Sequence, residues 1–155
     1  NEYPSLGGNY EVLHHTQFLK ELIENGRLEV SSKTFASNNL TFHDPCYLGR
    51  ANDEYDAPRF LLNKLGVNLK EMARNKQNAL CCGAGGAQMF KEEEKGTTRV
   101  NFERSEEAIE TGVNIIAANC PFCTTMLGDG LKNKEKEDDI QVMDIAEMVA
   151  QSLAE

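Results

Sequence analysis

The sequence of 155 residues contains no tryptophan, only four prolines and 7% aromatic residues, and it has no long uninterrupted apolar run. A helix that spans a bilayer needs about 18 or more apolar residues, and a secretory signal peptide needs a basic region followed by an apolar one. Neither pattern occurs in the sequence. We therefore expect no membrane contact from this segment and a cytoplasmic location, with the intact protein either free or held at the cytoplasmic face of a membrane.

Positive charge is also scarce, since 16 basic residues face 25 acidic ones and the formal net charge is -9 at pH 7. Binding to nucleic acid depends on basic side chains that neutralise phosphates, so we expect no nucleic-acid partner. The 40% of hydrophobic and 26% of charged residues are typical of a folded globular domain. The length suits a single hydrophobic core.

The beginning of the sequence differs from the remainder. The chain starts at Asn1 without a methionine, and its first ten residues are rich in turn formers. We therefore expect the sequence to be part of a longer protein. We interpret residues 1–37 as an N-terminal extension with one helix, which links the chain to a preceding domain, and residues 38–155 as a cysteine-rich domain.

Strand and helix patterns alternate along the chain. Apolar spacing and capping residues predict helices over residues 12–25, 56–65, 99–111 and 121–131 and from residue 144 onward. Strands are predicted over residues 39–42, 67–72, 113–118 and 140–143, and the charged run 91–95 is expected to be solvated. Asp56 is expected to cap one helix, and Asp144 with Glu147 resembles a capping box. This order predicts an α/β fold, a three-layer sandwich with a mostly parallel Rossmann-like sheet and helices on both faces.

Five cysteines stand out from this background. Their odd number, without an export signal, argues against a disulfide framework. We expect all of them at strand ends or turns, outside amphipathic helices, and we expect those that directly follow strands to converge where parallel strands end. We predict such a position after a strand for Cys46 and Cys120, and expect it for the double cysteine as well. The cysteines are Cys46, Cys81, Cys82, Cys120 and Cys123.

Three functions are compatible with these cysteines. A thioredoxin-like dithiol oxidoreductase would use the Cys-Pro-Phe-Cys pair at a helix start, but it leaves the other three cysteines without a role. A zinc-stabilised structural or interaction module needs four ligands, and five cysteines exceed that number. A polynuclear iron–sulfur cluster employs all five and implies electron transfer in a reducing compartment.

The cysteine pattern resembles the CCG-type cysteine-rich domain. In this pattern 34 residues separate Cys46 from the Cys81-Cys82-Gly83 motif, and a C-x-x-C pair follows at Cys120 and Cys123. Such domains occur in the catalytic subunits of heterodisulfide reductases, in the iron–sulfur subunit of glycolate oxidase and in related oxidoreductases. The strings that are similar to the HdrD-like branch of the heterodisulfide reductases include residues 43–50, 57–59, 81–86, 99–101 and 120–123.

The resemblance implies a domain of a larger oxidoreductase that binds a non-cubane [4Fe-4S] cluster for electron transfer or disulfide reduction. It implies that the five motif cysteines are the metal ligands. It also implies that the chain is the second of two CCG domains that follow a ferredoxin-like domain, with an electron donor such as a flavoprotein. Zinc remains the alternative metal.

Other polar residues and glycines close to the cysteines are candidates for supporting roles. His43 is a candidate proton donor or a hydrogen-bond donor to sulfur, with a purely structural role as the alternative. Asn119 could donate to the cluster or cap the following helix. Three glycines beside the double cysteine allow the backbone to approach a bound group: Gly83, Gly85 and Gly86. Four arginines could offset cluster charge, although surface salt bridges are the expected role of each: Arg50, Arg59, Arg99 and Arg104.

Overall fold

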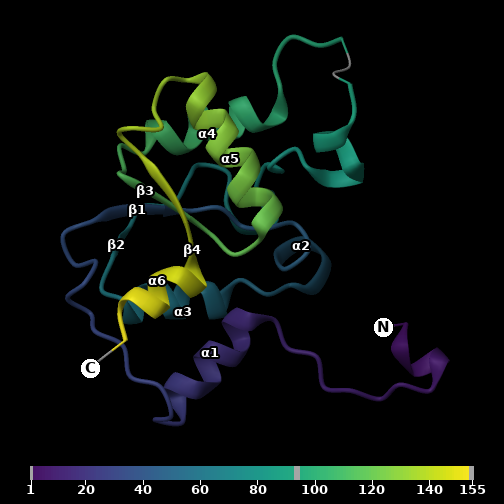
Figure 1. Cartoon of the computed structure of the whole chain (residues 1–155), viewed down its shortest axis with the longest axis vertical. Coiled ribbons are helices and arrows are strands. Elements are labelled where there is room, and N and C mark those ends of the chain that lie inside the picture. Colours follow the sequence, from purple (N-terminus) through teal and green to yellow (C-terminus); the bar gives the residue numbers. More distant parts are fainter. Residues whose placement is uncertain (1, 93–94, 154–155) are drawn as a thin grey trace.

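The computed structural model describes residues 2–92 and 95–153, and these form a four-stranded sheet with helices on both faces (Figure 1). The sheet order is β2-β1-β3-β4, and every neighbouring pair runs parallel. This confirms the predicted α/β fold. Some predicted features lie partly outside the described residues. These are residue 1 of the N-terminal extension, residues 93–94 of the charged run and residues 154–155 of the cysteine-rich domain. The strands are β1 (Asn39–Phe42), β2 (Asn68–Leu69), β3 (Ile115–Ala118) and β4 (Gln141–Asp144).

The helices agree with the predicted ones to within a few residues at each end, and further short helices occur between them. The α-helices are α1 (His15–Glu24), α2 (Gly49–Asn52), α3 (Asp56–Lys64), α4 (Val100–Glu110), α5 (Pro121–Asn133) and α6 (Ile145–Gln151). The 3-10 helices are η1 (Tyr3–Leu6), η2 (Lys76–Asn78) and η3 (Gly85–Phe90). Within the described residues, no helix is both long enough and apolar enough to traverse a membrane.

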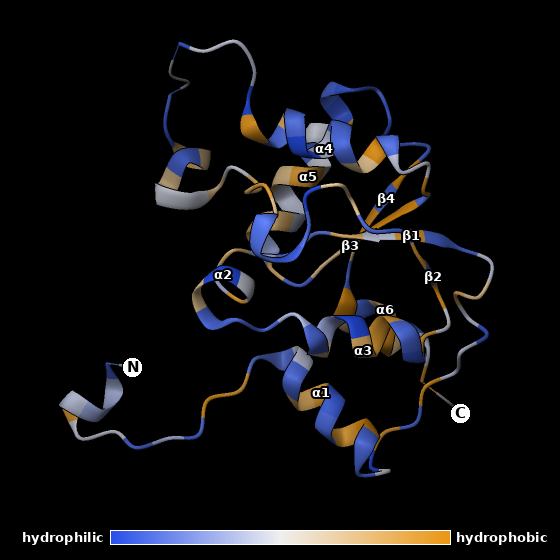
Figure 2. Ribbon diagram, turned by 180° about the vertical axis from the view of Figure 1, so that it is seen from behind, coloured by the Kyte–Doolittle hydropathy of each residue, from blue (hydrophilic) through white to orange (hydrophobic). Residues whose placement is uncertain are grey.

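The central strand β3 is buried along its whole length, as expected of a parallel strand between two layers of helices. Ile115 and Ala117 pack into the core on the side of α3 and α6, whereas Ile116 packs into the core on the side of α4 and α5. Figure 2 shows α3 and α6 on one side of the sheet and α4 and α5 on the other. Helix α1 packs outside α3 and α6, and its partly buried Leu19 and Ile23 contact the first of these cores.

Strand β2 is shorter than predicted because the chain leaves the sheet soon after Leu69. Lys70 still donates its N–H to the carbonyl of Leu40 at the sheet edge. Two residues later Met72, which is 1% exposed, is buried in the core on the side of α4 and α5. The energy gained by burying this side chain accounts for the turn away from the sheet.

Two helix starts show how well capping was predicted. The box at α6 is confirmed, since Asp144 accepts from the N–H of Ala146 and Glu147 accepts from the N–H of Asp144. The cap predicted at Asp56 is wrong, because Asp56 is already the first helical residue. Glu54 replaces it and accepts from the N–H groups of Asp56 and Ala57 at 3.0 and 2.8 Å.

Candidate metal centre

Adjacent strands bring two of the cysteines together. Phe42 of β1 pairs with Ala117 of β3, and the next residue, His43, donates its N–H to the carbonyl of Ala117 at 2.9 Å. The chain then reaches Cys46 after β1 and Cys120 after β3. Since the strands are parallel neighbours, both cysteines lie at the same edge of the sheet, as predicted.

The double cysteine reaches the same edge by a different path from the one predicted. It does not directly follow a strand, because η2 and a loop separate it from β2. Arg50 of α2 fixes this loop by donating to the carbonyl of Ala79 at 2.5 Å. Cys82 is then buried against Ala118 at the end of β3, with Cys81 packed beside it.

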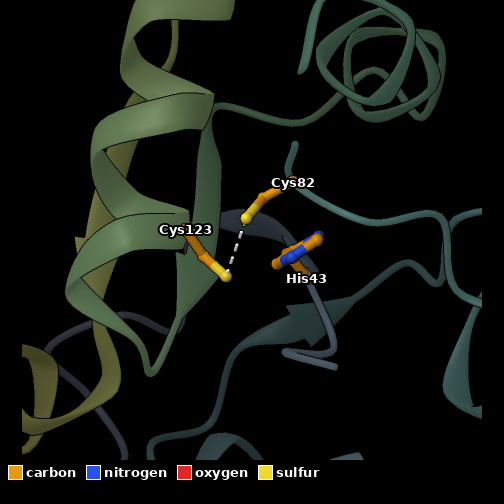
Figure 3. A group of neighbouring side chains, drawn as sticks. All are labelled: His43, Cys82 and Cys123. Carbon is orange, nitrogen blue, oxygen red and sulfur yellow. Dashed lines mark hydrogen bonds between the residues drawn. The ribbon is translucent and has the colours of Figure 1, made fainter. Parts of the chain in front are cut away.

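Cys82 and Cys123 are in direct contact (Figure 3). Their sulfur atoms lie 3.3 Å apart, well beyond the roughly 2.05 Å of a disulfide bond, and all five cysteines are free thiols. Cys123 belongs to the first turn of α5, so the expectation that no cysteine lies within a helix is wrong for this residue. Pro121 begins that helix as predicted, because its missing N–H costs nothing at this position.

The thiols influence one another's protonation. A hydrogen bond from Cys123 lowers the pKa of Cys82 to about 4, and His43 acts in the same direction. A hydrogen bond with Cys123 also lowers the pKa of Cys120 to about 6. The pKa of Cys123 is raised, first by its contact with Cys120 and then by that with Cys82. For Cys46, burial raises the pKa and the nearby Cys81 and Cys82 add to the effect. The thiolate form is therefore favoured at Cys82, which accepts from Cys123, and thiolates are the form that binds metal.

His43 lies against this sulfur pair and is 1% exposed. One of its ring nitrogens and the sulfurs of Cys82 and Cys123 all lie within 4.8 Å of one another. Its Nδ1 is 3.0 Å from Nε of Arg104, while its buried Nε2 has no hydrogen-bond partner among the described residues. Burial lowers the pKa of His43, and the charge of Arg104 lowers it further against an opposing effect of Cys82.

The surface salt bridge expected of Arg104 is wrong, because its side chain is fully buried. It bonds Glu107 and the carbonyl of Arg74, both at 2.8 Å, in addition to His43. The only sequence signal for this position is helical spacing, which places it on one face of α4 with Asn101, Ser105 and Ala108, all of which are buried.

The loop from His43 to Cys46 is braced by a second buried charge. Asp44, with a side chain 3% exposed, accepts two hydrogen bonds from Arg59 of α3 at 2.8 and 3.0 Å. Its carboxylate also accepts from the N–H of Lys76 at 2.7 Å. These bonds tie the exit of β1 to α3 and η2 and hold the backbone that carries Cys46.

Asn119 precedes Cys120 and is 2% exposed. The alternative that it caps α5 is wrong, because Cys120 occupies the N-cap position. Neither polar atom of its side-chain amide has a hydrogen-bond partner within residues 2–92 and 95–153. A buried amide without partners is costly, which suits a position beside a bound group that supplies them.

The three predicted glycines take different places. Gly85 and Gly86 line the cleft over the cysteines. Gly83 has a φ of +90°, which side-chain-bearing residues rarely adopt, and its N–H donates to the sulfur of Cys81 at 3.3 Å. Gly83 therefore shapes the turn that holds the double cysteine.

A cleft of about 1170 Å³ opens over the sulfurs. Four of the cysteines and Asn119 line it, and Cys81 lies beside it through its contacts with the others. Helix α1 and the residues before it form one wall, to which Val12, Leu13 and His14 contribute. The remaining lining is largely apolar and includes Tyr47, Phe90 and Phe122.

This donor set fits a soft, thiophilic metal. Thiolate ligands select zinc, copper(I) or iron–sulfur clusters, whereas magnesium and calcium prefer oxygen. Five thiols at one cleft, with the orphaned polar atoms of His43 and Asn119 close to them, fit an iron–sulfur cluster that accepts hydrogen bonds at its sulfurs.

Comparison with protein families agrees with this geometry. The model of the CCG family, described as a cysteine-rich domain, matches residues 40–128. The matched region contains all five cysteines and more than half of the chain.

Individual relatives point to larger proteins. The chain is 47% identical over 154 residues to the "Probable iron-sulfur-binding oxidoreductase FadF" of Bacillus subtilis, covering 99% of the chain and 21% of that protein. It is 41% identical over 155 residues to the EtfAB:quinone oxidoreductase of Syntrophomonas wolfei, covering 96% of the chain and 21% of that protein. It is 36% identical over 156 residues to one subunit of the dihydromethanophenazine:CoB--CoM heterodisulfide reductase of Methanosarcina barkeri, covering 98% of the chain and 37% of that subunit. The chain thus spans between about a fifth and two fifths of these relatives.

Proposed function

Because the chain belongs to the CCG family of cysteine-rich domains, we propose that it is the iron–sulfur-binding domain of a larger oxidoreductase of heterodisulfide-reductase type. The observation that carries this proposal is the convergence of five thiols at one cleft, with Cys82 and Cys123 only 3.3 Å apart. The names of the relatives, which include iron–sulfur-binding and heterodisulfide reductase activities, support it.

The residues proposed to hold a non-cubane [4Fe-4S] cluster are Cys46, Cys81, Cys82, Cys120 and Cys123. When bound, such a cluster supplies one-electron transfer and an iron that can capture sulfur from a disulfide-like substrate. The chain contributes the surroundings. Its largely apolar walls line the site, the Asn119 amide offers polar groups to it, and the brace at Asp44 holds the backbone near Cys46.

The proposal extends to the intact protein. Since the chain covers only part of its relatives, we propose that further domains, including another CCG domain and a ferredoxin-like domain, complete the enzyme in the cytoplasm or at the cytoplasmic face of a membrane. We propose a flavoprotein as the electron donor, as the resemblance of the cysteine motifs implies.

Zinc is the second candidate because one observation favours it. His43, Cys82 and Cys123 offer three buried ligand atoms within 4.8 Å of one another, which is a plausible partial set for a zinc ion. A zinc site of this kind would stabilise the fold without electron transfer.

Anaerobic reconstitution separates these candidates. Purified protein is incubated with iron and sulfide or with zinc, and bound iron, acid-labile sulfide and zinc are quantified. We expect iron and sulfide in equal amounts with a broad visible absorbance, and we expect Cys46→Ala to lose them. Thr125→Ala, which changes an exposed residue of α5 outside the lining of the cleft, is the matched control and should retain them.

Two results would overturn the iron–sulfur proposal. Tight zinc binding without sulfide uptake would favour the structural module. Disulfide reductase activity that survives Cys46→Ala without iron would favour a dithiol oxidoreductase that uses Cys120 and Cys123.

A further inference from the structure

The buried contact between His43 and Arg104 determines which atom of the histidine carries its proton. Nε of Arg104 lies 3.0 Å from Nδ1 of His43, and both side chains are almost completely buried. Arg104 is held in turn by Glu107 and by the carbonyl of Arg74, each at 2.8 Å. The guanidinium is therefore anchored from two further sides.

A guanidinium can only donate hydrogen bonds, because arginine stays protonated in proteins and offers no acceptor. Nδ1 of His43 must then accept with its lone pair. In a neutral imidazole the single proton is consequently on Nε2. Nε2 is buried without a hydrogen-bond partner among the residues described. One ring nitrogen of His43 lies within 4.8 Å of the sulfurs of Cys82 and Cys123, and because Arg104 engages Nδ1, Nε2 is the nitrogen that is free to interact with them.

This arrangement is the reverse of a metal-binding histidine. A histidine that ligates a metal usually donates its other N–H to a carboxylate or a carbonyl. Here the other nitrogen faces a donor, and the nitrogen near the sulfurs carries a proton in place of a free lone pair. His43 is therefore equipped to donate a hydrogen bond to sulfur and is not equipped to bind a metal ion, which argues against the zinc site that would use it as a ligand.

We propose that Arg104 is a positioning residue that holds His43 as the Nε2–H tautomer, so that His43 donates a hydrogen bond to cluster or cysteine sulfur and is not a metal ligand. The role toward a cluster rests on the function proposed above, whereas the tautomer is a property of the protein alone. A hydrogen bond to sulfur stabilises the more negative, reduced state of an iron–sulfur cluster. The pair thus raises the reduction potential of the site.

The first test uses the metal-free, fully reduced protein labelled with ¹⁵N, so that it does not depend on a cluster. Two-bond ¹H–¹⁵N correlation spectra distinguish protonated from unprotonated ring nitrogens. We expect an unprotonated Nδ1 and a protonated Nε2 in His43. A protonated Nδ1 with an unprotonated Nε2 would overturn the proposal.

Two variants show whether Arg104 is responsible. Arg104→Met removes the donor and should let the proton of His43 distribute over both nitrogens. Arg74→Met is the matched control, because its side chain binds Glu103 and Glu107 in the same charge network without touching His43. This control should leave the tautomer unchanged. If the folded Arg104→Met variant kept the Nε2–H tautomer of His43, the proposal that Arg104 holds this tautomer would be overturned.

The second test uses the iron-loaded protein. His43→Gln keeps an N–H donor near the position of Nε2, and His43→Leu removes it. Both should bind as much iron as the unchanged protein, and only His43→Leu should shift the reduction potential to more negative values in a redox titration followed by electron paramagnetic resonance. Loss of iron from both variants would make His43 a ligand and overturn the proposal. If the unchanged protein takes up no iron, the proposed function fails while the tautomer measurement still stands.

Discussion

Arg59 binds Asp44 through two parallel hydrogen bonds of 2.8 and 3.0 Å, and this pair joins α3 to the loop that follows β1. The guanidinium also binds Glu71, so one arginine connects two carboxylates. The two carboxylates differ in exposure, with a side chain 3% exposed for Asp44 and 32% for Glu71. Burial makes the first pair the more important one for stability.

This difference predicts unequal effects of two matched substitutions. Asp44→Asn should lower the free energy of unfolding by about 3 kcal/mol, because it leaves a largely buried guanidinium without its inner partner. Glu71→Gln, which removes the outer partner, should cost less than about 1 kcal/mol. Urea unfolding of the metal-free protein measures both. Equal losses would show that the inner pair has no special role.

Glu54 predicts a pH dependence of stability. Burial raises its pKa, but hydrogen bonds from Ala57, Gln17 and Asp56 outweigh this effect and place the pKa below the ordinary value of 4.5. A group with a lowered pKa stabilises the fold above its unfolded pKa, and the contribution is lost as the pH falls through the folded pKa. Glu54→Gln should therefore cost about 1 kcal/mol at pH 7, and its stability should converge with that of the unchanged protein below pH 4.5.

Unfolding by urea at pH 7 and at acid pH measures this convergence. Glu21→Gln, on the exposed surface of α1, is the control and should change the free energy of unfolding by less than about 0.5 kcal/mol at either pH. A cost of Glu54→Gln that is independent of pH would contradict the capping role of the ionised carboxylate.

Two glycines of α5 predict opposite outcomes for the same change. A Cβ on Gly130 would lie 2.8 Å from Cβ of Ser105 and 2.9 Å from the carbonyl oxygen of Asn101, because α4 and α5 approach closely there. A Cβ on Gly128 would meet no described atom within 4 Å. Gly130→Ala should destabilise the protein by about 1–3 kcal/mol through overpacking, and Gly128→Ala should stabilise it by up to about 1 kcal/mol through helix propensity.

Thermal unfolding of the two variants checks this prediction. Since both changes add one methyl group to the same helix, their shared effect on the unfolded chain cancels in the comparison. Similar thermal-unfolding midpoints for Gly130→Ala and Gly128→Ala would contradict the prediction, because they would mean that α4 moves away from α5 at little cost in stability.

Gly83 and Gly85 form another contrast beside the double cysteine. Gly83 has a φ of +90°, and a Cβ there would lie 3.3 Å from the N atom of Asn101. Gly85 has no described neighbour within 4 Å of such a Cβ. In the metal-free protein Gly83→Ala should cost about 1 kcal/mol or more, and Gly85→Ala should cost less than that. Chemical denaturation measures both, and a larger cost for Gly85→Ala would contradict this assignment.

Local patterns predicted the parts of the fold that depend on neighbouring residues. Helical spacing, glycine stops and the sequence between Asp144 and Glu147 predicted the main helices, and the β-branched run ending at Ala118 predicted the buried central strand. The positions of Cys46 and Cys120 followed from these strands. Such features require only the periodicity and capping chemistry of a short segment.

The features that were missed depend on contacts between distant residues. Arg104 is buried because His43 and Glu107 supply partners, and His43 is 61 residues away in sequence. Glu54 caps α3 in place of Asp56 through local hydrogen bonds, but the contact that holds its carboxylate there comes from Gln17 of α1, 37 residues away. The double cysteine reaches the site through a loop whose path depends on Arg50 and Ala79. No local pattern encodes these pairings, since each becomes visible only when the chain has folded.

The position of β1 beside β3 has a consequence for how related sequences can diverge. Cys46 and Cys120 line the same cleft because their strands are hydrogen-bonded neighbours, whatever number of residues lies between them. Part of that intervening chain, including η3 and residues 95–99 before α4, extends away from the sheet (Figure 1). Insertions or deletions there can change the interval between cysteine motifs without moving a sulfur atom. Homologues of this domain should therefore be aligned on the strand that precedes each cysteine, and not on a constant motif interval.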